Sequence, residues 1–169
     1  MNIQYIEKES IMNGEGNRCV VWCSGCSHHC PGCHNPETWD PNSGTTFTDD
    51  HVRELFTILE NPYIAGVTFS GGDPFHEQNR AIVLRLCKTL KHEFPDKDIW
   101  LYTGYNWETI KDWEDLKFID VIVEGPFIMS LLDVKYPWAG STNQRVIMVE
   151  ESLLQDKIVL WGEKNGKTQ

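Results

Sequence analysis

The sequence lacks the features that would place it in a membrane or on nucleic acid. No apolar run approaches the roughly 18 residues that a membrane-spanning helix needs. The N-terminus has no basic segment followed by an apolar one, so we expect no signal peptide. Positive charge is scarce, because 15 Lys and Arg stand against 25 Asp and Glu and leave a formal net charge of −10. Such a surface repels phosphate backbones, and we predict a cytoplasmic protein with neither a nucleic-acid nor a membrane partner.

The chain also lacks internal repeats, low-complexity segments and a recognisable linker. Its 169 residues and hydrophobic fraction of 40% are enough to bury a core without stabilising disulfides or metal sites. We therefore predict a single domain over residues 1–169, with a candidate C-terminal extension at about residues 155–169.

Segments rich in β-branched and aromatic residues alternate with segments of helical periodicity. Strands are predicted at 18–23, 66–70, 98–103, 119–124, 145–149 and 158–161, and helices from Thr48 to Asn61, at 76–94 and at 107–116. This alternation implies a parallel sheet with right-handed crossovers. A closed eight-unit barrel takes about 250 residues, more than this chain has. We predict an α/β fold, an incomplete and laterally open (β/α) barrel of mostly parallel strands.

The cysteines are clustered. Five of the six lie between Cys19 and Cys33, and three of them share the loop Cys26-Ser-His-His-Cys30-Pro-Gly-Cys33 after the first predicted strand. Three thiolates in so short a loop can converge on one metal centre, and thiolates suit iron–sulfur clusters and zinc. A four-iron cluster held by Cys26, Cys30 and Cys33 would keep one iron open to another ligand.

Other uses of these cysteines compete with that interpretation. Structural zinc could be held by Cys23, Cys26, Cys30 and Cys33, although zinc modules usually place about a dozen residues between the two pairs. A ferredoxin-type site requires a further cysteine before this run, which the sequence lacks. Incidental cysteines are disfavoured by their density.

The same cysteine spacing occurs one register earlier, at Cys19, Cys23 and Cys26. Cys19 and Cys23 flank a strand interior, where two residues four apart are separated by about 13 Å, too far for one cluster. The later triplet is therefore the predicted ligand set. We predict that Cys19, Cys23 and Cys87 are core thiols.

A glycine motif, Ser70-Gly71-Gly72-Asp73-Pro74, follows the second predicted strand. Loops at the carboxyl ends of parallel strands meet at one edge, so we expect this loop to face the cysteine loop. The two motifs, in this order and each after a strand, resemble the radical S-adenosylmethionine (SAM) superfamily. Within this superfamily, the sequence most resembles the activating proteins of anaerobic (class III) ribonucleoside-triphosphate reductase. The segments that carry this narrower resemblance are residues 13–19, 103–105, 123–127 and 140–145.

This resemblance implies an enzyme, an oxidoreductase with a barrel of the radical SAM type. The three cysteines would bind a [4Fe–4S] cluster whose open iron is chelated by the methionine amino and carboxylate groups of SAM. An electron from a flavodoxin-like donor would cleave SAM reductively. The 5′-deoxyadenosyl radical would then take hydrogen from one glycine of the reductase and leave a glycyl radical.

The resemblance also implies cofactor contacts. The loop of Gly71, Gly72 and Asp73 would lie at the methionine amino group, and backbone at Gly32, Cys33 and His34 would contact adenine. Many superfamily members have an aromatic residue before the third cysteine, where this chain has Gly32, so only the backbone contact carries over. Further candidates for contacts with cofactor or partner are Tyr102, Thr103, Asn143, Gln144 and Arg145.

Two other functions stay open at this point. One is activation of a different glycyl-radical enzyme, of the pyruvate formate-lyase type. The other is a non-catalytic, zinc-binding interaction module.

Overall fold

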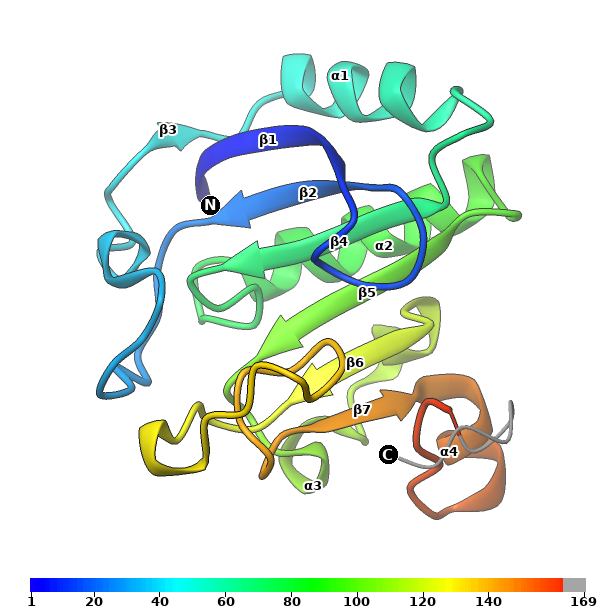
Figure 1. Cartoon of the computed structure of the whole chain (residues 1–169). Coiled ribbons are helices and arrows are strands. Elements are labelled where there is room, and N and C mark those ends of the chain that lie inside the picture. The colour runs from blue at the N-terminus through cyan, green and yellow to red at the C-terminus, as the bar shows by residue number, and fades with distance from the viewer. Residues whose placement is uncertain (163–169) are drawn as a thin grey trace.

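The computed structural model describes residues 1–162, which form one seven-stranded sheet in the order β3-β1-β2-β4-β5-β6-β7 (Figure 1). The strands are β1 (Asn2–Ser10), β2 (Arg18–Cys23), β3 (Thr45–Thr46), β4 (Gly66–Gly71), β5 (Asp98–Thr103), β6 (Val121–Glu124) and β7 (Arg145–Met148). The α-helices are α1 (Asp49–Leu59), α2 (Arg80–Glu93), α3 (Trp107–Ile110) and α4 (Val149–Gln155). Short 3₁₀ turns are η1 (Pro36–Thr38), η2 (Glu114–Phe118) and η3 (Met129–Leu131). None of the helices in residues 1–162 is long and apolar enough to cross a membrane.

The four central strands, β2, β4, β5 and β6, run parallel, as the sequence predicts. Antiparallel strands flank them: β1 pairs with β2, β3 with β1, and β7 with β6. Within the described residues the sheet does not close, because β3 and β7 are its two ends. The predicted open α/β architecture is therefore confirmed.

The structure corrects several predicted elements. The strand β1 was not predicted, because its polar residues interrupt the alternation of apolar and polar side chains that marks a strand. Its pairing with β2 holds it in the sheet. The predicted helix at 107–116 is one turn, α3, followed by η2. Helix α2 begins at Arg80 rather than near residue 76, because residues 73–79 form consecutive hydrogen-bonded turns.

The predicted strand at 158–161 is replaced by an isolated bridge between Ile147 and Leu160, after the unpredicted helix α4. This segment nevertheless lies along β7, since Met148 N donates to Val159 O at 2.9 Å and Trp161 N to Val146 O at 2.8 Å. Residues 158–162 of the predicted extension thus pack on the domain. Residues 163–169 of that extension lie outside the described chain.

The two faces of the sheet have different cores, because successive side chains of a strand point to opposite faces. Cys19, Val21 and Cys23 of β2 belong to the main core, together with apolar residues of α1 and α2. The other face carries a smaller core around Trp100 and Val123. The side chains of Cys19 and Cys23 therefore point toward the helices.

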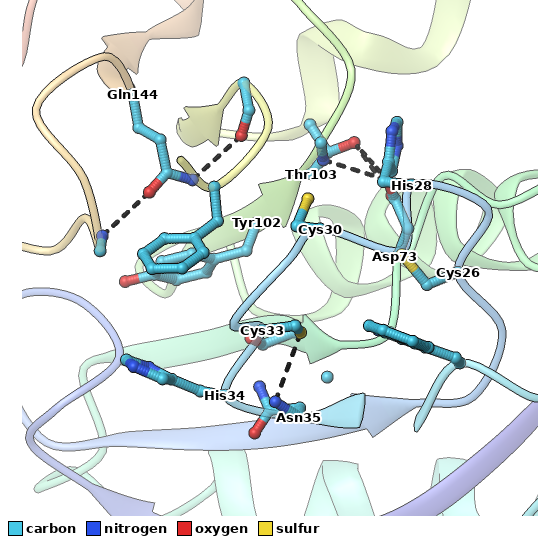
Figure 2. A pocket seen from close by; sticks show the side chains of 18 of the residues that line it. Cys26, His28, Cys30, Cys33, His34, Asn35, Asp73, Tyr102, Thr103 and Gln144 are labelled. Atoms are coloured by element: carbon cyan, nitrogen blue, oxygen red, sulfur yellow. Dashed lines mark hydrogen bonds and ion pairs between the residues drawn. The ribbon is translucent and has the colours of Figure 1, made fainter. Parts of the chain in front are cut away.

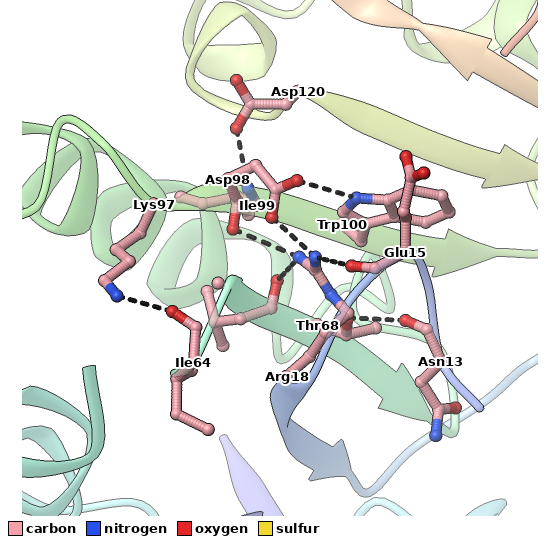
Figure 3. Close-up of polar contacts among 12 residues, drawn as sticks. Asn13, Glu15, Arg18, Ile64, Thr68, Lys97, Asp98, Ile99, Trp100 and Asp120 are labelled. Carbon is pink, nitrogen blue, oxygen red and sulfur yellow. Dashed lines mark hydrogen bonds and ion pairs between the residues drawn. The ribbon is translucent and has the colours of Figure 1, made fainter. Parts of the chain in front are cut away.

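A buried arginine anchors the loop between β1 and β2 on this second face (Figure 3). Arg18 pairs with Asp98 at 2.6 Å, and its Nε donates to Thr68 Oγ1 at 2.9 Å. It also donates to the carbonyl oxygen of Glu15 at 2.9 Å. The Thr68 hydroxyl in turn donates to the Asn13 carbonyl oxygen at 2.7 Å. These bonds bring Asn13 to the site described next.

Candidate iron–sulfur site

The carboxyl ends of the four parallel strands surround one cavity of about 330 Å³ (Figure 2). The cysteine loop and the glycine loop face each other across it, as expected from their places at one sheet edge. Of the predicted site residues, the cavity is lined by Cys26, Cys30, Cys33, His34, Gly71, Gly72 and Asp73. Gly32 lies in the same loop but does not line the cavity.

The glycine loop is packed directly against the backbone of the cysteine loop. Gly72 N donates to Cys23 O and Asp73 N to Gly25 O, both at 2.8 Å. A Cβ atom on residue 72 would lie 2.6 Å from the Gly25 carbonyl oxygen, closer than real Cβ contacts. Gly71 has a φ of +99°, which glycine adopts at little cost. The glycines are therefore required by the packing of the two loops, whatever ligand they bind.

A tight turn carries the last two cysteines of the triplet. Cys33 N donates to Cys30 O at 3.0 Å, and Gly32 between them has a φ of +77°. Proline followed by a glycine of positive φ is the pattern of a type II turn. The side chain of Met129 lies over this turn, so that a Cβ atom on residue 32 would be 2.9 Å from its sulfur. The positive φ of the turn thus favours glycine over an aromatic residue at position 32.

The buried carboxylate of Asp73 is the centre of a hydrogen-bond network. It lies 2.7 Å from His28 Nε2 and accepts from the Thr103 hydroxyl at 2.9 Å. It also accepts from Gly104 N at 3.1 Å and Phe75 N at 2.8 Å. Four donors nearly exhaust the acceptor capacity of a carboxylate. The side chain of Asp73 therefore joins the cysteine loop to the ends of β4 and β5, and its predicted contact with SAM stays a prediction.

The imidazole of His28 is enclosed on two further sides. It makes an edge contact with the ring of Tyr105, with ring centroids 4.8 Å apart. A Cβ atom on residue 104 would collide with the His28 ring, so Gly104 provides the space for it. His28 lies in the sequence between Cys26 and Cys30, and its ring position therefore restrains the path of the cysteine loop.

The six cysteines fall into two environments. Cys26, Cys30 and Cys33 are partly exposed at the cavity, whereas the other three are buried, and all six are free thiols. Burial raises the pKa of Cys19 and of Cys23 to about 12. Burial also raises the pKa of Cys26. The thiols accessible from the cavity are thus those of the later triplet, and their role as cluster ligands stays a prediction.

The cavity does not have the geometry of a single-ion site. Among residues 1–162, no three His, Cys, Asp or Glu side chains are gathered closely enough to hold one metal ion. A structural zinc site needs four ligands in a compact tetrahedron. Cys23, which the zinc alternative requires, faces the helices. Three thiols lining one cavity are the donor set that an iron–sulfur cluster takes, and Asn35 N donates to Cys33 Sγ at 3.4 Å.

Several residues of the cavity wall were not predicted from the sequence, among them Asn13, Trp22, Trp39 and Phe127. Trp22 could have been found from the alternation of side chains along a strand. Because Cys23 faces the helices, its neighbour Trp22 must face the other side of the sheet. Tyr102, a predicted candidate, lines the same wall, and burial raises its pKa.

The candidates after residue 140 contact other parts of this chain. Gln144 accepts from Gly140 N at 2.9 Å and donates to Gly125 O at 3.0 Å, so it joins two loops at the cavity (Figure 2). Arg145 pairs with buried Glu124 at 2.5 Å and with Glu108 at 3.2 Å. The guanidinium of Arg145 therefore binds two carboxylates of this chain, Glu124 of β6 and Glu108 of α3.

Comparison with known proteins adds an independent finding. The family described as "4Fe-4S single cluster domain" matches residues 12–147, which span the whole cavity wall. The anaerobic ribonucleoside-triphosphate reductase-activating protein of Enterobacteria phage T4 is 44% identical over 146 residues, covering 86% of this chain and 93% of the relative. Proteins of the same name from Vibrio cholerae and Escherichia coli K12 are 40% and 39% identical, covering 85% and 86% of this chain and 96% and 97% of theirs.

Proposed function

Since the chain belongs to the family of anaerobic ribonucleoside-triphosphate reductase-activating proteins, we propose that it activates such a reductase by generating a glycyl radical with SAM. The observation that carries the proposal is the cavity in which three free, accessible thiols face a glycine loop. We also propose that the open sheet is an incomplete barrel of the radical SAM type, whose open side admits a loop of another protein.

Cys26, Cys30 and Cys33 would hold a [4Fe–4S] cluster with one open iron. The chemistry supplied there is transfer of one electron, received from a flavodoxin-like donor, to the SAM sulfonium, which breaks into methionine and a 5′-deoxyadenosyl radical. Hydrogen transfer from a glycine Cα of the reductase to that radical would then give 5′-deoxyadenosine and the glycyl radical. The electron count balances with one external reductant.

The residues of this chain would bind and orient SAM. The N–H groups of the methionine amine would need acceptors, and the N–H groups of Gly72 and Asp73 already donate to the cysteine loop. We therefore assign the amine to carbonyl groups of Gly71 and Gly72. Backbone at Gly32, Cys33 and His34 is assigned to adenine. The side chain of Asp73 holds His28 and Thr103 in place beneath these contacts.

The test is anaerobic purification followed by chemical reduction in the presence of SAM. We expect a brown protein with about four irons per chain and formation of 5′-deoxyadenosine. Coexpression with an anaerobic reductase is expected to give a glycyl signal in electron paramagnetic resonance. A colourless protein with stoichiometric zinc and no cleavage would overturn the proposal. A glycyl signal confined to a lyase-type partner would overturn the choice of substrate.

A further inference from the structure

Most of the large exposed apolar side chains belong to two short segments of the chain. Eleven large hydrophobic side chains are exposed within the described residues, and seven of these lie in the short segments 11–12 and 128–134. Met12, Leu132 and Val134 from these segments line one groove of about 500 Å³. We call the side chains of Met12, Met129, Leu131, Leu132 and Val134 the apolar rim. Concentrations of apolar surface of this kind mark interaction sites on soluble proteins.

The groove is continuous with the cysteine cavity. Asn13, His34, Tyr102 and Gly140 line both of them. Met129, at the near end of the rim, lies directly over Gly32 between two of the cysteines. The groove therefore adjoins the mouth of the cavity.

Backbone hydrogen bonds, rather than side-chain burial, hold the segment 128–134 in place. Thr142 N donates to Leu131 O at 2.9 Å, and Leu132 forms an isolated bridge with Ser141. Ile128 N donates to the hydroxyl of the same serine at 3.2 Å. The segment is thus shaped by the chain itself while its apolar side chains face water, with Val134 89% exposed. This is the arrangement of a preformed docking surface, which has little ordering entropy to lose on binding.

We propose that the apolar rim is the surface on which the glycine-bearing domain of the reductase docks, with apolar side chains of that domain in the groove. The inference rests on the proposed function, in which a glycine within a folded partner must reach the cysteine cavity. The partner must then cover the mouth of that cavity, and the rim is the apolar surface continuous with it. A second copy of this chain seated there would instead obstruct the entry of the glycine.

The experiment compares the double variant Leu132→Ser/Val134→Ser, and separately Val134→Asp, with the unchanged chain. Val134 is so exposed that its substitution leaves folding intact. The matched controls are Leu154→Ser and Tyr63→Ser, which remove exposed apolar side chains outside the two segments. Leu154 belongs to α4, which follows the carboxyl end of β7 and lies at the other end of the strands from the carboxyl ends of β4, β5 and β6 (Figure 1).

Binding to the purified reductase is measured anaerobically by calorimetry, together with glycyl radical yield and SAM cleavage by a chemical reductant without reductase. We expect both rim variants to weaken binding by about tenfold or more, and to lower the radical yield at limiting reductase. SAM cleavage without reductase is expected to stay unchanged. The control variants should bind like the unchanged chain.

Three results would overturn the inference: rim variants that bind the reductase normally, rim variants that change only the oligomeric state, and rim variants that lose only reduction by a flavodoxin. These results differ from failure of the proposed function. If the unchanged chain binds the reductase through the rim but cleaves no SAM, the radical chemistry fails while the docking surface stands.

Discussion

His28 Nε2 lies 2.7 Å from the carboxylate of Asp73, and this contact fastens the cysteine loop to the end of β4. The contact spans 45 residues of sequence. It is supported by Thr103 and Gly104 at the end of β5, so three segments of the cavity wall share one buried carboxylate. The arrangement makes Asp73 and His28 positioning residues for the cysteines.

Substitution of Asp73 by Ala is expected to reduce both stability and iron binding. It leaves the buried donors of Phe75 and Thr103 without their acceptor, at about 1–3 kcal/mol for each unsatisfied group, and also frees the half-buried N–H of Gly104. Urea denaturation measures the loss of stability, and iron per chain after anaerobic reconstitution measures the effect on the loop. Asp73→Asn, which keeps one carbonyl acceptor, should lose less. Equal stability of Asp73→Ala and the unchanged chain would contradict the network.

Gly104 and His28 form a pair that a double-mutant cycle can test. Gly104→Ala places a Cβ atom against the His28 ring, so we expect it to lower iron content about as much as His28→Ala does. The double variant should be no worse than His28→Ala alone, because the colliding ring is gone. Additive losses would show that Gly104 has a different role. His92→Ala, at an exposed histidine of α2, is the control.

Thiol alkylation distinguishes the two cysteine registers. In the native, metal-free chain at about pH 8, iodoacetamide should label Cys30 and Cys33 and spare Cys19 and Cys23. Burial raises the pKa of the latter pair to about 12, so few of these thiols are ionised at that pH. Cys26 should react more slowly in the native than in the denatured chain, because burial raises its pKa. Mass spectrometry of the digested protein identifies the labelled cysteines. The denatured chain is the control, in which all six cysteines should react.

Removal of single cysteines should separate ligands from core thiols. Cys30→Ala is expected to lose the brown colour and the visible absorption of a cluster, because only two of the three predicted cysteine ligands remain at the cavity. Cys87→Ala removes a buried thiol of α2 in the main core and should keep both, at a modest cost in stability. Retention of a full cluster by Cys30→Ala would refute the assigned ligand set.

Replacement of Arg18 by Met should destabilise the fold. The change leaves Asp98 without its partner and frees carbonyl and hydroxyl acceptors around a buried side chain. Loss of one partner from a buried ion pair costs about 3–5 kcal/mol. Because Asp98 is partly exposed, we expect a loss at the lower end of this range, about 3 kcal/mol. Urea denaturation measures it. The exposed pair of Lys8 and Glu54 supplies the control, since Lys8→Met should change stability little.

The amino-acid sequence by itself determined the parts of this protein that depend on local chemistry. Strands β2 and β5 occupy the predicted residues, because runs of β-branched and aromatic side chains favour extended chain. The turn between Cys30 and Cys33 follows from Pro31 and Gly32. The choice of the later cysteine triplet needed only the length of a strand and stays a prediction, and Cys23 of the earlier triplet faces the helices.

Tertiary structure alone decided the features that join distant segments. Strand β1 exists through its pairing with β2, and Asp73 gained its positioning role from His28 and Thr103, which are remote in sequence. The need for glycine at position 72 comes from the Gly25 carbonyl across the two loops. The apolar rim likewise appears only when segments 11–12 and 128–134 meet at one groove. Each of these features is a contact between groups whose separation along the chain carries no local signal, so only the folded chain reveals it.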